Sequence, residues 1–213
     1  MQLFVGLGNP DPEYARNRHN VGFMAVEAIR RHHDFPDWRR KFQGVAAEGQ
    51  IDGEQVTLLL PGTYMNESGR SVREAAHNRC ALSDIVVFHD EVQQPPAKLR
   101  VKQGGGNAGH KGLRSISALV GNDYRRVQIG VGKPAEKGGL DRYVLSDFDR
   151  SEWPWIQTLM IAIANNSPLL TKRLDTTFEE KIQLLMDAEG FCKKDSPKDV
   201  LQRRQMNQMS KKE

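Results

Sequence analysis

The sequence predicts an α/β fold: a single domain with a twisted, mixed and mostly parallel sheet flanked by helices. Strand-like and helix-like segments alternate along the chain, which is typical of this class. The 213 residues suffice for one well-packed domain and are few for two. They contain no internal repeat and no interdomain linker. We therefore expect one domain over residues 1–189 and a basic C-terminal tail over residues 190–213.

Apolar periodicity and turn residues predict the elements of the first half of the chain. We expect strands over residues 3–7, 44–51 and 55–60 and helices over residues 20–32 and 68–79. Asn20 is a good N-cap, and apolar residues recur at helical spacing after it. The second and third strands form a hairpin around Asp52-Gly53, the strongest turn signal in the chain.

The same patterns predict the second half. We expect strands over residues 85–88, 99–103 and 127–131 and helices over residues 113–120, 151–164 and 178–189. The run Ile85-Val86-Val87-Phe88 is apolar throughout, as a central strand should be. Pro154 is compatible with a helix because it falls in the first turn.

Composition indicates a soluble, cytoplasmic protein. The apolar fraction is 38%, and no run approaches the roughly 20 apolar residues of a membrane span. The apolar run at the N-terminus is too short for a signal peptide and lacks its flanks. Cys80 and Cys192 have neither the number nor the spacing of a disulfide framework or a thiolate zinc site.

The formal net charge of +4 is concentrated in the tail. Residues 193–213 contain seven Lys or Arg against three Asp or Glu, a difference equal to the charge of the whole chain. A polar, basic end with few apolar residues is typical of a disordered tail. Two interpretations stay open: the tail contacts a polyanion, or it only increases solubility.

The first loop, Gly6-Leu7-Gly8-Asn9-Pro10-Asp11, does not fit a dinucleotide-binding turn. Asp11 stands where that fingerprint needs a third glycine, and Pro10 delays the next helix. The glycines instead let the backbone turn at the end of a strand and bring Asn9 into a cleft. His19 lies just before a helix. A lone histidine is most often structural, but a helix N-terminus disfavours its charged form and suits a general base.

Three further polar clusters each follow a predicted strand, at residues 63–66, 89–91 and 104–112. Ligands bind at strand ends in open α/β sheets, so these loops and Asn9 are expected to converge on one cleft. Singly, Asn66 could be a helix cap, Asp90 a turn residue and the glycine run a flexible loop. Their recurrence favours a site.

The motifs VGLGNP, Tyr14, His19-Asn20, TYMN, HDE, GGGNAGHKGL and RRVQIGVGKP, in this order, resemble the bacterial-type peptidyl-tRNA hydrolase family. The resemblance is specific from about residue 3 to residue 132 and looser to residue 189. It implies a monomeric α/β protein without cofactor or metal. It further implies that the chain hydrolyses the ester between a peptide and the 3′ end of tRNA, which recycles tRNA in translation.

The resemblance also implies residue roles. His19 would activate water and Asp90 would orient its ring. Asn9 would probe the peptide, Asn66 would bind beside the reacting carbonyl, and Tyr14 and Tyr64 would line the cleft around the terminal nucleotide, where an aromatic ring can stack on a base. His110, Lys111 and Lys102 would bind the tRNA part of the substrate.

Two positions depart from the family pattern. Lys111 replaces the Asn of His-Asn-Gly, and its ammonium cannot accept a hydrogen bond but can meet a phosphate or carbonyl. Gln128 replaces the Arg that partners Lys102 on the terminal phosphate, so one charge-assisted contact is missing. Basic residues that could compensate, or could be ordinary surface charges, are Arg100, Arg114, Arg125, Arg126 and Lys133.

Two functions remain possible at this stage. The first is a working peptidyl-tRNA hydrolase without metal, since the six histidines show no ligand spacing and no Gly-x-Ser-x-Gly elbow is present. The second is a homologue that binds RNA but has weak or no turnover, which the changes at Lys111 and Gln128 and the basic tail keep open. The presence of both His19 and Asp90 favours the enzyme, because a pure binding protein has no need of an oriented base.

Overall fold

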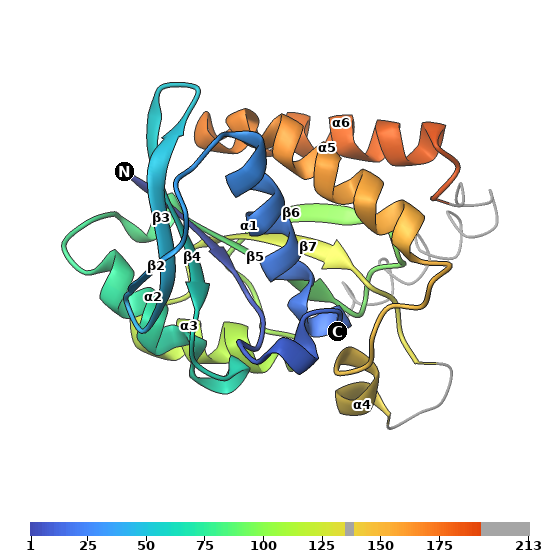
Figure 1. The fold of residues 1–213 in the computed structure, drawn as a ribbon, viewed down its shortest axis with the longest axis horizontal. Helices are drawn as coiled ribbons and strands as arrows, with labels where there is room; N and C mark the ends of the chain where they lie inside the picture. The colour runs from blue at the N-terminus through green and yellow to red at the C-terminus, as the bar shows by residue number, and fades with distance from the viewer. Residues whose placement is uncertain (135–138, 193–213) are drawn as a thin grey trace, which may run out of the picture.

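The computed structural model describes residues 1–134 and 139–192; the predicted tail therefore lies almost entirely outside the described residues. A seven-stranded mixed sheet has the order β2-β3-β4-β1-β5-β7-β6 (Figure 1). Its strands are β1 (Gln2–Gly6), β2 (Arg39–Lys41), β3 (Gly44–Ile51), β4 (Glu54–Pro61), β5 (Ile85–Glu91), β6 (Leu99–Gln103) and β7 (Arg125–Gly130). The four central strands, β4, β1, β5 and β7, run parallel, and β3 and β6 pair antiparallel at their sides.

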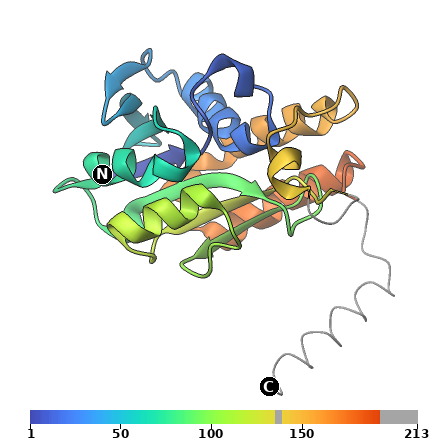
Figure 2. The same cartoon turned by 90° about the horizontal axis from the view of Figure 1, so that it is seen from below.

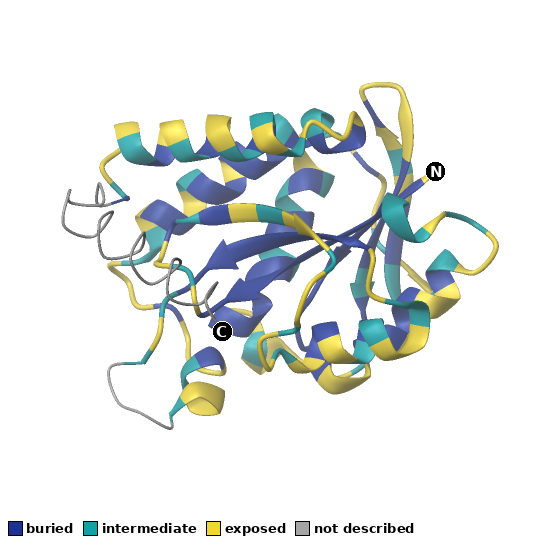
Figure 3. Cartoon of the chain, turned by 180° about the vertical axis from the view of Figure 1, so that it is seen from behind, coloured by how far each residue is buried: buried dark blue, intermediate teal, exposed yellow. Residues whose placement is uncertain are grey.

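Helices cover both faces of this sheet. They are α1 (Val21–His32), α2 (Ser68–Ala76), α3 (Lys111–Val120), α4 (Leu140–Val144), α5 (Trp153–Thr171) and α6 (Asp175–Ala188). Side chains of β1 alternate between the faces: Phe4 packs with α1, α5 and α6, whereas Leu3 and Val5 pack with α2 and α3. Figure 2 shows α1 and α3 on opposite sides of β5, and Figure 3 shows the buried strands between the helices. The predicted fold class is confirmed.

One strand, β2, and one α-helix, α4, were not expected, and β5 extends three residues beyond its predicted end. The strand β2 is short and fully charged, the composition of an edge strand rather than of an apolar run. The helix α4 is a single short turn without a repeating apolar face. The strand β5 continues to Glu91, because β7 supplies backbone partners beside His89 and Asp90. The prediction that it ends at Phe88 is therefore wrong.

The start of α1 packs tightly against the ends of β1 and β5. The N–H of Phe23 donates to the carbonyl of Leu7 at 3.2 Å, and the N–H of Leu7 donates to the carbonyl of Phe88 at 2.9 Å. A Cβ added to Gly22 would lie 2.2 Å from the Phe88 oxygen, so only glycine permits this approach. The packing holds the residues just before α1 beside the end of β5.

No helix in the described parts of the chain combines the length and the apolar composition needed to cross a bilayer. The hairpin over β3 and β4 is confirmed. Asp52 and Gly53 both have positive φ angles, +50° and +82°, as its two-residue turn requires. Asn20 lies at the predicted start of α1, but its side chain does not cap the helix. It binds elsewhere, as described below.

Candidate active site

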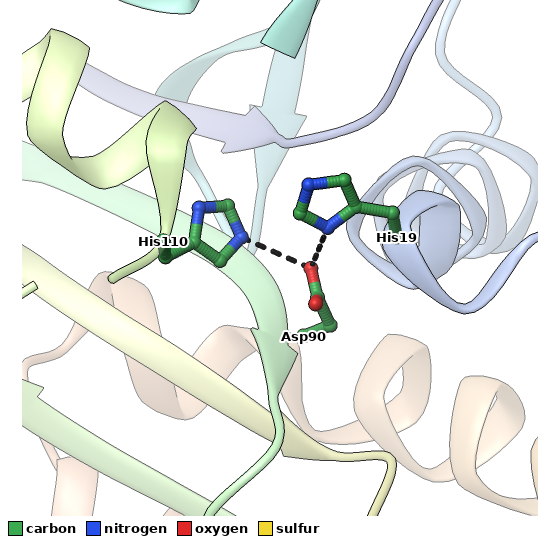
Figure 4. Close-up of side chains that lie close together, drawn as sticks. All are labelled: His19, Asp90 and His110. Carbon is green, nitrogen blue, oxygen red and sulfur yellow. Dashed lines mark hydrogen bonds and ion pairs between the residues drawn. The ribbon is translucent and has the colours of Figure 1, made fainter. Parts of the chain in front are cut away.

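His19, Asp90 and His110 form a buried, hydrogen-bonded triad (Figure 4). His19 belongs to a short 3₁₀ helix, Arg18–Asn20, that leads into α1, and Asp90 belongs to β5. The Nδ1 atom of His19 lies 2.8 Å from Oδ1 of Asp90. The Nε2 atom of His110 lies 3.0 Å from the same oxygen. The pair of His19 and Asp90 expected from the sequence is thus brought together, and His110 joins it.

The protonation of the triad follows from its hydrogen bonds. Burial opposes ionisation of Asp90, but the attraction of the two imidazoles and the hydrogen bonds they donate outweigh it and hold the pKa of Asp90 well below its usual range. A carboxylate only accepts hydrogen bonds, so Nδ1 of His19 and Nε2 of His110 must both carry protons. The lone pair of His19 is therefore on Nε2, and the ring lines the cleft described below.

His110 also caps a helix. Its Nδ1 accepts hydrogen bonds from the backbone N–H groups of Gly112 at 3.1 Å and Leu113 at 3.4 Å, at the start of α3. Both ring nitrogens thus have protein partners. One ring nitrogen of His19, one ring nitrogen of His110 and a carboxylate oxygen of Asp90 lie within 4.8 Å of one another, a spacing that could hold a metal ion. A metal ion there would have to displace the two ring protons that point at the carboxylate.

His89 contacts two members of the triad, Asp90 and His110. It is buried, and its Nδ1–H donates to the backbone carbonyl of Asp90 at 2.8 Å. Its ring packs edge-on against His110, with 5.2 Å between the ring centres. Burial, and next the neighbouring His110, lower the pKa of His89 to about 3. His89 is therefore neutral at physiological pH.

Asn9 is held at the cleft by its neighbours. Its backbone N–H donates to Oδ1 of Asn20, and its backbone carbonyl accepts from Nδ2 of Asn20, both at 2.9 Å. Its side-chain Oδ1 accepts from the N–H of Met65 at 2.9 Å. These bonds leave the two donors of the Asn9 Nδ2 group for other partners. They also explain why Asn20 does not cap α1, since both ends of its amide are used here.

A cleft of about 260 Å³ opens over the triad. Of the other residues predicted for the site, Asn66, Tyr64 and Lys111 line it together with Asn9. Tyr14 and Lys102 do not line it. The opposite wall was not foreseen from the sequence; its apolar residues are Val92, Leu140, Val144 and Leu145, the last three from α4 and the residue after it.

Lys111 spans the rim of this cleft. Its Nζ lies 3.2 Å from Oδ2 of Asp141, so the start of α3 is connected to α4 by an ion pair. Both side chains are exposed, at 50% and 78% of their surface. The pair is consequently weak and open to competition from a bound anion.

Gln128 and two of the basic residues that could compensate for it, Arg125 and Arg126, are already bonded to other protein groups. Nε2 of Gln128 donates to Oε2 of buried Glu91 at 2.9 Å, so this side chain faces an acid. Arg125 pairs with Asp175, and Arg126 donates to the carbonyl of Gly106, both at 2.8 Å, and both arginines are buried. Neither is free to replace the missing phosphate contact. The remaining candidates, Arg100, Arg114 and Lys133, are exposed.

A second network, also missed from the sequence, anchors the 3₁₀ helix that carries His19. The buried guanidinium of Arg18 pairs with Glu152 and donates to Oγ of Ser146 at 3.1 Å. It also lies over the ring of Tyr143, 4.6 Å from its centre. These partners are more than 120 residues away in the chain, so no local pattern could have indicated them.

An α/β domain that places a carboxylate-oriented imidazole in a cleft at its strand ends has the site of a hydrolase. The family model described as peptidyl-tRNA hydrolase matches residues 3–188. The chain belongs to the peptidyl-tRNA hydrolase family, and the resemblance seen in its motifs is confirmed.

Relatives agree with this assignment over nearly the whole chain. A peptidyl-tRNA hydrolase of Nitrobacter hamburgensis is 54% identical over 200 residues, which cover 93% of this chain and 98% of the relative. One from a Bradyrhizobium species is 56% identical over 195 residues, covering 91% and 97%. The crystal structure of peptidyl-tRNA hydrolase from Acinetobacter baumannii has a TM-score of 0.80 at 35% identity, covering 85% of this chain and 94% of that one.

Proposed function

We propose that His19 is the general base with which this chain hydrolyses peptidyl-tRNA. The observation that carries the proposal is the hydrogen bond of its Nδ1–H to Asp90, which leaves Nε2 as the proton acceptor in the cleft. Nε2 takes a proton from water, and the oxygen of that water attacks the ester carbonyl. The bond to the ribose oxygen then breaks, and the imidazolium returns its proton to this oxygen. The products are a free peptide and tRNA.

Asp90 and the two asparagines complete the proposed machinery. The carboxylate of Asp90 orients the ring of His19 and stabilises the imidazolium that forms during attack. The Nδ2 donors of Asn9 contact the peptide near the ester, and Asn66 binds beside the reacting carbonyl. A hydrogen-bond donor to a developing oxyanion is worth about 10²–10³-fold in rate, and a positioned base about 10²–10⁴-fold. An ester needs no stronger assistance.

The tRNA part of the substrate extends beyond the cleft. Tyr64, with 58% of its surface exposed, provides a face for the terminal base, and Lys111 provides a charge at the rim. Tyr14 and Lys102 lie outside the cleft and are proposed to contact RNA further from the ester. We further propose that the chain acts as a monomer in the cytoplasm and without a metal.

The test is hydrolysis of an N-acetylaminoacyl-tRNA under single-turnover conditions by wild type and His19→Ala. We expect the rate constant to fall by about 10²–10⁴-fold while thermal unfolding and tRNA affinity stay close to those of wild type. The matched control is His77→Ala, which removes an exposed histidine at the end of α2 and should change nothing. A folded His19→Ala variant with wild-type turnover would refute the proposal.

The alternative, an RNA-binding homologue without turnover, has less support. Its motive was the changes at Lys111 and Gln128 and the basic tail. Lys111 pairs with Asp141 and Gln128 donates to Glu91, so neither of these contacts involves the hydrogen bonds of the triad. The same assay separates the two functions, since the alternative predicts that the wild-type chain binds tRNA and leaves the ester intact.

A further inference from the structure

We propose that His110 is a positioning residue that holds Asp90 and limits how strongly its charge acts on His19. This role differs from the substrate contact expected for His110 from the sequence. It rests on the proposed function of His19 as the general base.

The contacts of His110 leave it no nitrogen for a substrate. Its Nε2–H donates to Asp90, and its Nδ1 accepts from two backbone N–H groups of α3. Only 7% of the side-chain surface is exposed. A substrate group could bind either nitrogen only by breaking a bond that already exists.

The helix start determines which nitrogen of His110 carries the proton. A second proton, on Nδ1, would face the N–H groups of Gly112 and Leu113, and it would break both hydrogen bonds. The ring would then be a cation at the positive end of the α3 dipole. The neutral ring with its proton on Nε2 is thus the form that α3 selects, and this form always presents a donor to Asp90.

His19 and His110 donate to the same carboxylate oxygen, Oδ1 of Asp90, from ring centres 4.8 Å apart. The two N–H groups share the negative charge of that oxygen, so each of them weakens the attraction that the other one feels. If His110 is lost, Asp90 keeps only its hydrogen bond to His19, and the whole charge of the carboxylate acts on that N–H. The carboxylate that orients the ring of His19 is then no longer held by a side chain that is itself fixed to the start of α3.

Two substitutions separate the two contacts of His110. The oxygen of Asn lies where Nδ1 lies in His, so His110→Asn keeps the cap on α3 and is too short to reach Asp90. The amide nitrogen of Gln lies near the place of Nε2, so His110→Gln keeps a donor for Asp90 and loses the cap. The readouts are kcat, KM and the pH dependence of kcat/KM on an N-acetylaminoacyl-tRNA, together with thermal unfolding.

We expect His110→Asn to unfold at the temperature of wild type but to lose about 10- to 10²-fold in kcat, because a displacement of the catalytic geometry by about 1 Å can cost that much. The acidic limb of its pH profile should move to higher pH. His110→Gln should unfold at a lower temperature and keep most of kcat and the position of that limb.

Other outcomes overturn the proposal. Wild-type kcat and pH profile in His110→Asn would make the residue a helix cap only. A raised KM with unchanged kcat would make it a substrate contact, as expected from the sequence. His19→Ala is measured alongside. If that variant keeps wild-type turnover, the base itself is misassigned, whereas an inactive His19→Ala beside an unaffected His110→Asn refutes the role of His110 alone.

Discussion

His89 is expected to make the fold sensitive to acid. The buried ring stays neutral until the pH falls to about 3, the pKa that burial and the adjacent His110 impose on it. In the unfolded chain the same group takes up a proton near its ordinary value of 6.5. Between these two values the unfolded state binds more protons than the folded state, so the free energy of unfolding decreases as the pH falls.

The size of this effect follows from the two values. One pKa unit corresponds to about 1.4 kcal/mol, so lowering the pH from neutral to about 5, some 1.5 units below the ordinary value, costs about 2 kcal/mol through His89 alone. Because the ring is only 1% exposed, solvent screening does not reduce it appreciably. For a domain with a stability of about 5–15 kcal/mol this is a measurable fraction.

The measurement is urea denaturation at about pH 7 and about pH 5 on wild type, His89→Asn and His77→Asn. An Asn amide at position 89 can still donate to the carbonyl of Asp90 but cannot take up a proton. Its free energy of unfolding should therefore fall by about 2 kcal/mol less than that of wild type. His77→Asn, which removes an exposed histidine, should follow wild type. Equal losses in wild type and His89→Asn would refute the reasoning.

Three further predictions concern the site and the tail. Asp90→Asn should reduce the single-turnover rate, but less than the about 10²–10⁴-fold expected for His19→Ala, because the amide oxygen still accepts from the ring of His19 but carries no charge. Lys111→Ala should raise KM and leave kcat intact if Lys111 binds RNA, and wild-type values of both constants would exclude a role for this side chain. Lys111→Asn should keep activity. Deletion of residues 193–213 should flatten the salt dependence of tRNA affinity, and unchanged slopes would leave a solubilising tail.

Local patterns were sufficient for most of the fold. The strands β1 and β6 lie within one residue of the predicted positions, and the Asp52-Gly53 turn lies where it was predicted. The apolar run of β1, the alternation of apolar and polar residues in β6 and the Asp-Gly pair are all local features of the sequence. The end of β5 could not be found in this way. His89, Asp90 and Glu91 are polar, and they are extended and buried only because β7 pairs with them.

Most of the residues predicted for the site line the cleft, whereas Tyr14 and Lys102 do not, and the geometry of the site was not predictable. The motif order indicates His19 and Asp90, and the structure places them 2.8 Å apart. The second contact on Asp90 was missed, because a histidine that caps a helix has no sequence signature like that of Ser or Asp. The apolar wall from α4 and the anchoring of Arg18 depend on segments distant in the chain, which periodicity does not report.

The glycine-rich loop reaches the cleft by a route that the strand pattern does not predict. We expected its polar residues at the cleft because they follow a strand. However, β6 is antiparallel to β7, so it ends beside Arg125 at the start of β7, away from the strand ends that form the cleft. The loop must therefore run back along the sheet before α3 begins at the cleft. Gly105 and Gly109 have φ angles of +94° and +81°, and an added Cβ at either would meet no atom within 4 Å. Glycine is needed there for the backbone conformation and not for space. The chain reversals that deliver His110 to Asp90 thus account for these two glycines without any bound phosphate.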